Sequence, residues 1–126
     1  MRHTQTAFFY FFSILLSMNI FANIEMLKLD PGFKISIFAS DLDQPRQMIE
    51  SKNGTIFIGE RSGQIIALLD SDGNGQADSK RVIADDLTYS TGVSIFEGDL
   101  YFSEISKIWK IQDIEKWLQK NSSGFP

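Results

Sequence analysis

The chain of 126 residues has no cysteine, three prolines and a single histidine, His3. Without cysteine it can form no disulfide and has no thiolate to serve as a nucleophile or metal ligand. Beyond the N-terminus it has no imidazole to act as a general base. Basic residues are also in deficit, with 12 Lys and Arg against 16 Asp and Glu. The net charge of −4 and the lack of a basic cluster argue against nucleic-acid binding.

The first 22 residues have the pattern of a secretory signal peptide. Arg2 and His3 are basic, residues 7–21 are apolar apart from two serines and one asparagine, and Ala22 precedes a more polar sequence. The apolar run is shorter than the roughly 20 residues that a membrane-spanning helix needs. We therefore expect residues 1–22 to be removed on export to a periplasm or to the outside. An uncleaved N-terminal anchor is the alternative.

Two stretches of the remaining sequence repeat one another. Residues 53–60 read NGTIFIGE and residues 97–104 read EGDLYFSE, and the glycines Gly54 and Gly98 are 44 positions apart. A period in the forties built of short strands is typical of a β-propeller blade, which has four strands. Because about four to eight blades are needed to close a ring, the chain has room for about two. We predict an all-β fold: an incomplete β-propeller with about two of an expected six blades.

The predicted elements follow from the alternation of apolar and polar residues and from the turn signals between them. A strand at residues 33–38 precedes a four-stranded blade at 42–86, an incomplete three-stranded blade at 87–112 and a short amphipathic helix at 113–120, for which Asp113 is the expected N-cap. The first strand has no partner, so its edge and the open side of the second blade predict self-association. A small autonomous β protein that resembles two blades is the alternative.

The loop at residues 70–78, DSDGNGQAD, is the densest cluster of potential metal ligands. It matches positions one to nine of an EF-hand loop through oxygen atoms of Asp70, Asp72, Asn74, Gln76 and Asp78. Such hard ligands suit Ca²⁺, but position twelve, normally a bidentate glutamate, is Arg81. The sequence predicts a weak calcium site with a structural function. A plain polar turn is the alternative, because Asp, Asn and Gly are common in turns.

The order and spacing of five segments resemble the N-terminal part of the glucose/sorbosone dehydrogenase family, which are exported quinoprotein sugar dehydrogenases. The segments lie at residues 29–39, 42–48, 53–59, 70–78 and 98–104. The resemblance implies a six-bladed propeller that binds pyrroloquinoline quinone and calcium and oxidises aldoses or related sugars. A histidine takes the proton in that family. His3 lies in the predicted signal, so we expect no catalytic residue in the mature chain.

By the same resemblance, the loops that enter the innermost strand of each blade face the quinone. Arg46, Gln47, Ser90 and Thr91 are therefore cofactor-binding candidates by analogy. Relatives often carry Asn or His at the position of Thr91, so this chain departs from the pattern there. For Arg46, ion pairing with nearby carboxylates on the surface is the alternative. Glu60 and Glu104 recur at equivalent positions of the two repeats, which favours a structural function for both.

We expect the chain to be the N-terminal portion of an exported quinone-dependent sugar dehydrogenase that is inactive by itself. The alternative is a non-catalytic exported propeller module that binds a partner or a glycan, since fold alone does not decide function.

Overall fold

A computed structural model describes residues 26–120. The expected signal peptide at residues 1–22, with His3, lies outside the described residues. The described residues belong to two units, 26–34 and 35–120, each considered by itself. In the first unit residues 31–32 form a turn, with the Phe33 N–H donating to the Asp30 carbonyl oxygen at 3.2 Å. Within residues 26–120 no helix is long and apolar enough to cross a membrane.

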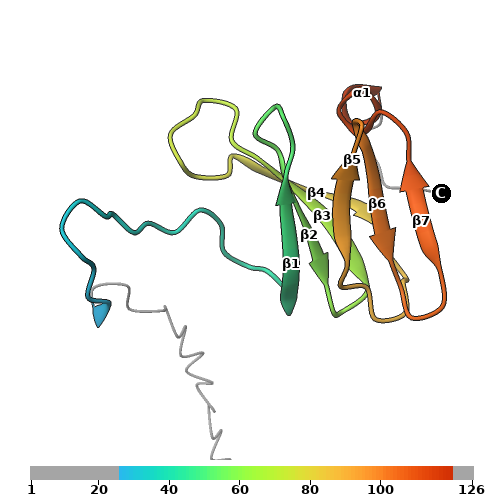
Figure 1. Ribbon diagram of the computed structural model, residues 1–126, viewed down its shortest axis with the longest axis horizontal. Coiled ribbons are helices and arrows are strands. Elements are labelled where there is room, and N and C mark those ends of the chain that lie inside the picture. Colours follow the sequence, from blue (N-terminus) through green and yellow to red (C-terminus); the bar gives the residue numbers. More distant parts are fainter. Residues whose placement is uncertain (1–25, 121–126) are drawn as a thin grey trace, which may run out of the picture. The chain divides into compact units, whose positions relative to one another are not determined.

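The second unit contains two antiparallel sheets and one helix (Figure 1). The first sheet has the order β1 (Pro45–Glu50), β2 (Ile56–Glu60), β3 (Gln64–Leu69), β4 (Ser79–Ala84), and the second has β5 (Val93–Phe96), β6 (Asp99–Ser103), β7 (Ile108–Ile111), followed by α1 (Ile114–Lys120). The predictions of four strands, then three strands, then a short helix are confirmed. No closed barrel is formed by the described strands.

The backbone repeats itself in the loops that enter β1 and β5. Asp41 and Gln44 have φ values of 57° and 55°, and Asp86 and Tyr89, each 45 positions later, have 54° and 62°. Positive φ is uncommon for residues other than glycine, so a matched pair of such residues is unlikely to recur by chance. The two loops therefore share positive φ at two equivalent positions, one with the same residue, Asp41 and Asp86, and one with different residues, Gln44 and Tyr89.

One hydrophobic core lies between the facing sides of the two sheets and α1. The first sheet contributes Phe57, Ile65, Ala67, Ile83 and Ala84, the second Val93, Leu100, Phe102 and Ile111, and the helix Ile114 and Leu118. Each of these residues is buried. Along β3 and β6 the residues that face this core alternate with residues that face away from it, as the pleat of a strand requires, whereas Ile83 and Ala84 are adjacent in β4, where the pairing with β3 is irregular.

The other side of the first sheet is also covered. Ile58, Ile66 and Leu68 form a second buried cluster on that side, packed by Phe38, Ala39, Leu42, Ile56 and Ala77. The Ala77 N–H donates to the Phe38 carbonyl oxygen at 2.8 Å, which fixes the incoming chain to the loop between β3 and β4. The central strands β2 and β3 are thus buried on both faces.

The prediction of a strand at residues 33–38 requires correction, because the structure has no strand there. A strand needs a neighbouring backbone to share its hydrogen bonds. Phe38 instead packs its side chain on the face of the first sheet and does not join an edge. Asp113 lies at the expected N-cap position: it directly precedes α1 with φ of 45°, and its backbone carbonyl oxygen accepts the Trp117 N–H at 2.9 Å.

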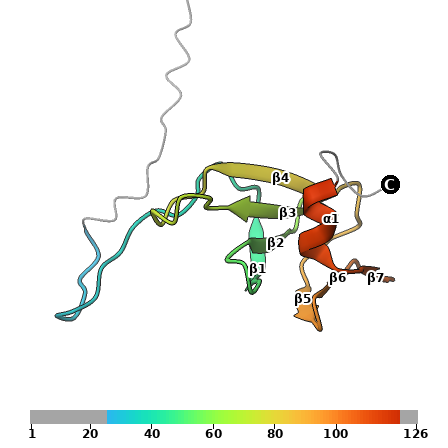
Figure 2. The same cartoon turned by 90° about the horizontal axis from the view of Figure 1, so that it is seen from above.

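The two sheets approach each other most closely along β1 and β5, and β2 also reaches β5. Figure 2 shows the sheets diverging from this line, with α1 in the space between β4 and the second sheet. The helix is fastened to the first sheet at two places. Ser51 and Thr55 donate hydroxyl hydrogen bonds to Glu115, and Arg81 Nη1 donates to the Leu118 carbonyl oxygen at 2.9 Å.

Candidate functional site

The loop between β3 and β4 brings three predicted metal ligands together. Carboxylate oxygens of Asp70, Asp72 and Asp78 all lie within 4.8 Å of one another. The loop closes at its base, where the Asp78 N–H donates to the Leu69 carbonyl oxygen at 2.8 Å. Like charges at this spacing repel one another, and a divalent cation between them would relieve that repulsion.

Backbone N–H groups of the loop hold the carboxylates in place. Asp70 accepts hydrogen bonds from the N–H groups of Gly73, Asn74 and Gly75 at 2.8, 3.1 and 2.9 Å. Asp78 accepts one from the Ser71 N–H at 2.6 Å. These bonds hold the loop backbone around the carboxylates, so the three side chains are placed as one cluster of oxygen atoms.

Asn74, another predicted ligand, fits less well. The Asn74 side chain lies within the loop: its Nδ2 donates to Asp72 at 2.9 Å and its Oδ1 accepts the Gln76 N–H at 2.8 Å. Its oxygen is therefore engaged with Gln76. Arg81, at the position of the usual bidentate glutamate, is in β4 and donates to α1. The described loop thus offers three carboxylates from one side and lacks the strong twelfth ligand.

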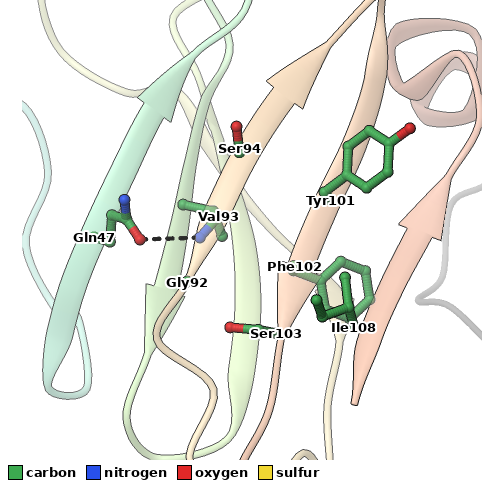
Figure 3. A pocket seen from close by; sticks show the side chains of 8 residues that line it. All are labelled: Gln47, Gly92, Val93, Ser94, Tyr101, Phe102, Ser103 and Ile108. Carbon is green, nitrogen blue, oxygen red and sulfur yellow. Dashed lines mark hydrogen bonds between the residues drawn. The ribbon is translucent and has the colours of Figure 1, made fainter.

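Of the cofactor candidates, Gln47 lies where the two sheets meet. Its side chain extends from β1 toward β5, and its Oε1 accepts the Val93 N–H at 3.3 Å (Figure 3). An open pocket of about 240 Å³ adjoins this contact, lined by Gln47, Gly92, Val93, Ser94, Tyr101, Phe102, Ser103 and Ile108. The three hydroxyl groups of Ser94, Tyr101 and Ser103 and the Gln47 amide are the polar side-chain groups of this lining, which has no charged side chain.

The other three candidates do not line this pocket. Arg46 is exposed on β1 and makes no ion pair among the described residues, so the alternative of a surface ion pair also lacks support. Ser90 is fully buried, and its Oγ has no hydrogen-bond partner within residues 26–120. Thr91 is half-buried, and its backbone packs closely against Gly59. A Cβ added to Gly59 would lie 2.6 Å from the Thr91 carbonyl oxygen.

Glu60 and Glu104 have the same function in the two sheets. Glu60, 2% exposed, accepts the Asp43 N–H at 2.9 Å, and Glu104 accepts the Thr88 N–H at 2.9 Å. Each carboxylate thereby holds the loop that enters the first strand of its sheet. The prediction that these glutamates are structural agrees with this geometry. The sequence could not name their partners, because a backbone N–H has no sequence signal.

The environment of Glu104 also sets its ionisation. The Thr88 N–H, with the Lys107 ammonium group and the Trp109 Nε1–H, holds the pKa of the Glu104 carboxyl below its ordinary value. At the opposite end of β6, the Asp113 N–H and Lys110 hold the pKa of Asp99 below its ordinary value, and Asp99 raises the pKa of Lys110. Both carboxylates are thus favoured in the charged form in the folded second sheet.

Comparison with known proteins gives limited guidance. The chain is 28% identical over 98 residues to an uncharacterized protein from Borreliella burgdorferi, a match that covers 75% of this chain and 24% of that protein. The chain thus spans about a quarter of the length of this relative. No family model matches the chain, and no solved structure matches it.

Proposed function

We propose that the two sheets are neighbouring blades of a β-propeller, and that they form the N-terminal portion of an exported quinone-dependent sugar dehydrogenase. In this proposal the chain contributes structure to the ring and does not oxidise sugar by itself. A non-catalytic exported propeller module that binds a partner or a glycan is the second candidate.

The observation that carries the propeller is the repetition of loop geometry with the same period as the sequence. The residue pairs Asp41 and Asp86, and Gln44 and Tyr89, are 45 apart and share positive φ. In each repeat a glutamate at the end of the second strand binds the loop before the first strand. Sheets that are closest at their first strands and diverge outward have the arrangement of blades around an axis.

The described residues do not by themselves fit pyrroloquinoline quinone. Arg46 is the only cation of the four candidates, whereas the quinone carries several carboxylates. Ser90 is fully buried, so its hydroxyl cannot contact a ligand on an open face, and the Gln47 oxygen is engaged with Val93. The proposal therefore assigns no catalytic step to this chain, and a quinone site would need residues from elsewhere in a longer ring.

Calcium fits the residues better, and in this proposal it is held by Asp70, Asp72 and Asp78. Their oxygens converge within 4.8 Å and are hard ligands. The ion would pin the loop between β3 and β4, which also anchors residue Phe38 through Ala77. Its function would be structural, because the loop carries no group of a reaction centre.

The experiment has two parts. The purified chain, with added quinone and calcium, should not reduce an electron-acceptor dye with any aldose; turnover above background would contradict the inactivity. The reading frame beyond codon 126 should encode further repeats of about 45 residues, with a histidine and several Arg or Lys in the loops before the innermost strands. Further repeats without those residues would favour the binding module, and a frame without repeats would remove the propeller.

A further inference from the structure

The outer edge of β7 has no strand partner among residues 26–120. In the first sheet the equivalent edge of β3 is covered by β4, with Ile66 opposite Val82 and Leu68 opposite Lys80. Because the two sheets match strand for strand up to this point, the edge of β7 has the geometry for one more antiparallel strand. An unpaired edge presents a row of N–H and C=O groups to any extended backbone.

Two hydrogen bonds define which backbone groups face outward on β7. The Glu104 N–H donates to the Lys107 carbonyl oxygen and closes the hairpin between β6 and β7, whereas the next residue back, Ser103, donates to Gly92 on the β5 side. Bonding direction alternates along an antiparallel strand. The residues paired with Ser103 and Tyr101, which are Ile108 and Lys110, therefore direct their backbone groups away from β6.

The described chain contains a segment with the sequence pattern of a strand that is in neither sheet. Residues 33–37 alternate apolar and polar side chains, as a half-buried strand does, yet they belong to neither sheet. The apolar members Phe33, Ile35 and Ile37 are 75%, 39% and 45% exposed. Exposed apolar side chains in such a pattern favour pairing with a sheet edge that has apolar neighbours.

Phe38, directly after the segment, is fastened to the first sheet. It packs on the side of that sheet that faces away from the second sheet, and its carbonyl oxygen is bonded to Ala77. Ile37 directly precedes Phe38 and therefore starts from the first sheet, whereas the open edge belongs to the second sheet. The edge of β7 in another molecule can approach the segment freely, so we take it as the partner.

We propose that residues 33–37 of one copy of the chain pair with the outer edge of β7 in a second copy. Reciprocal exchange completes a fourth strand in both second sheets and gives a closed dimer with two-fold symmetry. Main-chain hydrogen bonds supply the affinity in this mode of recognition, and the alternating side chains supply the register. The inference rests on the unpaired edge of β7 and on the strand-like pattern of residues 33–37. It does not require the proposed sugar chemistry.

The first test is sedimentation velocity of the purified full chain over a dilution series. We expect an apparent mass that falls about twofold on dilution. Ile35→Pro removes a backbone N–H from the exchanged strand, so it should abolish the association. Lys28→Pro, an exposed position outside the strand, is the matched control and should leave it intact. A monomer at all concentrations, or a dimer that survives Ile35→Pro, would overturn the proposal.

The second test locates the contact. Because the chain has no cysteine, Ser36→Cys and Ile108→Cys each introduce a unique thiol. After the two variants are mixed, a short bis-maleimide should link them to each other, and Ile35→Pro in the first variant should prevent the link. Met48→Cys, which is exposed on β1, is the control position. If Ser36→Cys is linked efficiently to Met48→Cys and not to Ile108→Cys, the contact lies on β1 and not on β7, and the proposal is overturned.

Discussion

The central strands of the first sheet, β2 and β3, are buried on both faces, whereas β6 of the second sheet is buried on one. Ile66 on the outer side of β3 is 1% exposed because residues 38–42 and Ala77 cover it, whereas Ile108 on β7 is 79% exposed. The strand sequences of the two sheets also differ in their pattern of apolar residues. The β3 sequence, QIIALL, has a continuous apolar run of buried residues, whereas burial alternates along the β6 sequence, DLYFS. A continuous apolar run indicates two buried faces and alternation indicates one.

The loops before β1 and β5 agree in geometry both where their sequences match and where they differ. Asp41 and Asp86 are identical, whereas Asp43 and Thr88 are chemically different, yet the N–H of each of the latter two is held by a glutamate at the end of the second strand. At Asp43 and Thr88 the backbone contact is therefore the repeated feature, and the side chain differs.

The largest expected effect compares two isoleucines. Ile66→Ala removes buried methyl groups between β3 and the residues that cover it, so we expect a loss of about 2–5 kcal/mol in the free energy of unfolding. Ile108→Ala removes exposed groups and should change it by less than about 0.5 kcal/mol. Urea denaturation of the two variants measures the difference. Equal losses would mean that the second sheet is covered as fully as the first.

The next effect compares two glycines at the junction of the sheets. A Cβ at Gly59 would lie 2.6 Å from the Thr91 carbonyl oxygen, which belongs to the backbone, so Gly59→Ala should cost about 1–3 kcal/mol. A Cβ at Gly92 would meet the Ser103 Oγ at 2.5 Å, and that side chain can rotate away. Gly92→Ala should therefore lower the thermal unfolding temperature by less than Gly59→Ala does. The reverse order would show that the loop before β5 is not held against β2.

Calcium should act on the first sheet, because within residues 26–120 the second sheet has no equivalent of the acidic cluster in the loop at residues 70–78. With a dissociation constant near 10⁻⁴ to 10⁻³ M, about 10 mM calcium should stabilise the fold by about 1.4–2.7 kcal/mol. Hydrogen exchange should slow most in β3 and β4. In the matched variant Asp72→Asn the calcium effect should disappear, while the metal-free protein should become more stable because a repelling charge is lost. An unchanged response in Asp72→Asn would argue against this site.

Lowering the pH should destabilise the second sheet, and we expect this change in stability to be smaller than the one caused by calcium. The folded-state pKa values of Glu104 and Asp99 are lowered from ordinary values of 4.5 and 3.8, so their contribution is present above those values and is lost as pH falls below them. Hydrogen exchange in β6 and β7 should therefore quicken below about pH 4.5. Glu104→Gln should remove part of this pH dependence. The same acid profile in wild type and variant would exclude Glu104 as its cause.

Much of the fold could be predicted because hairpin turns and strand alternation are local signals. Gly54 and Gly98 mark the turns, and the observed strands lie within the predicted ranges 42–86 and 87–112. The prediction at residues 33–38 was wrong because alternation shows which faces a strand could have, and does not show whether a partner is in reach. Phe38 packs on a sheet face through residues that are distant in the sequence, and the local sequence pattern does not indicate such a contact.

The candidate sites were predictable to different degrees. The carboxylates of residues 70–78 converge as the EF-hand spacing predicts, because the ligands and the turn lie in one short segment. The burial of Ser90 and the engagement of Gln47 with Val93 depend on how two sheets meet. Neither could be derived from the sequence.

The central claim is that the two sheets diverge from β1 and β5 as neighbouring blades do. Spin labels at exposed positions measure this directly: one pair at Met48 and Ser94 on the first strands, the other at Lys80 and Lys110 on the last. Pulsed dipolar spectroscopy should give a clearly shorter distance for the Met48–Ser94 pair than for the Lys80–Lys110 pair. Equal distances would describe a parallel-faced sandwich and would contradict the account.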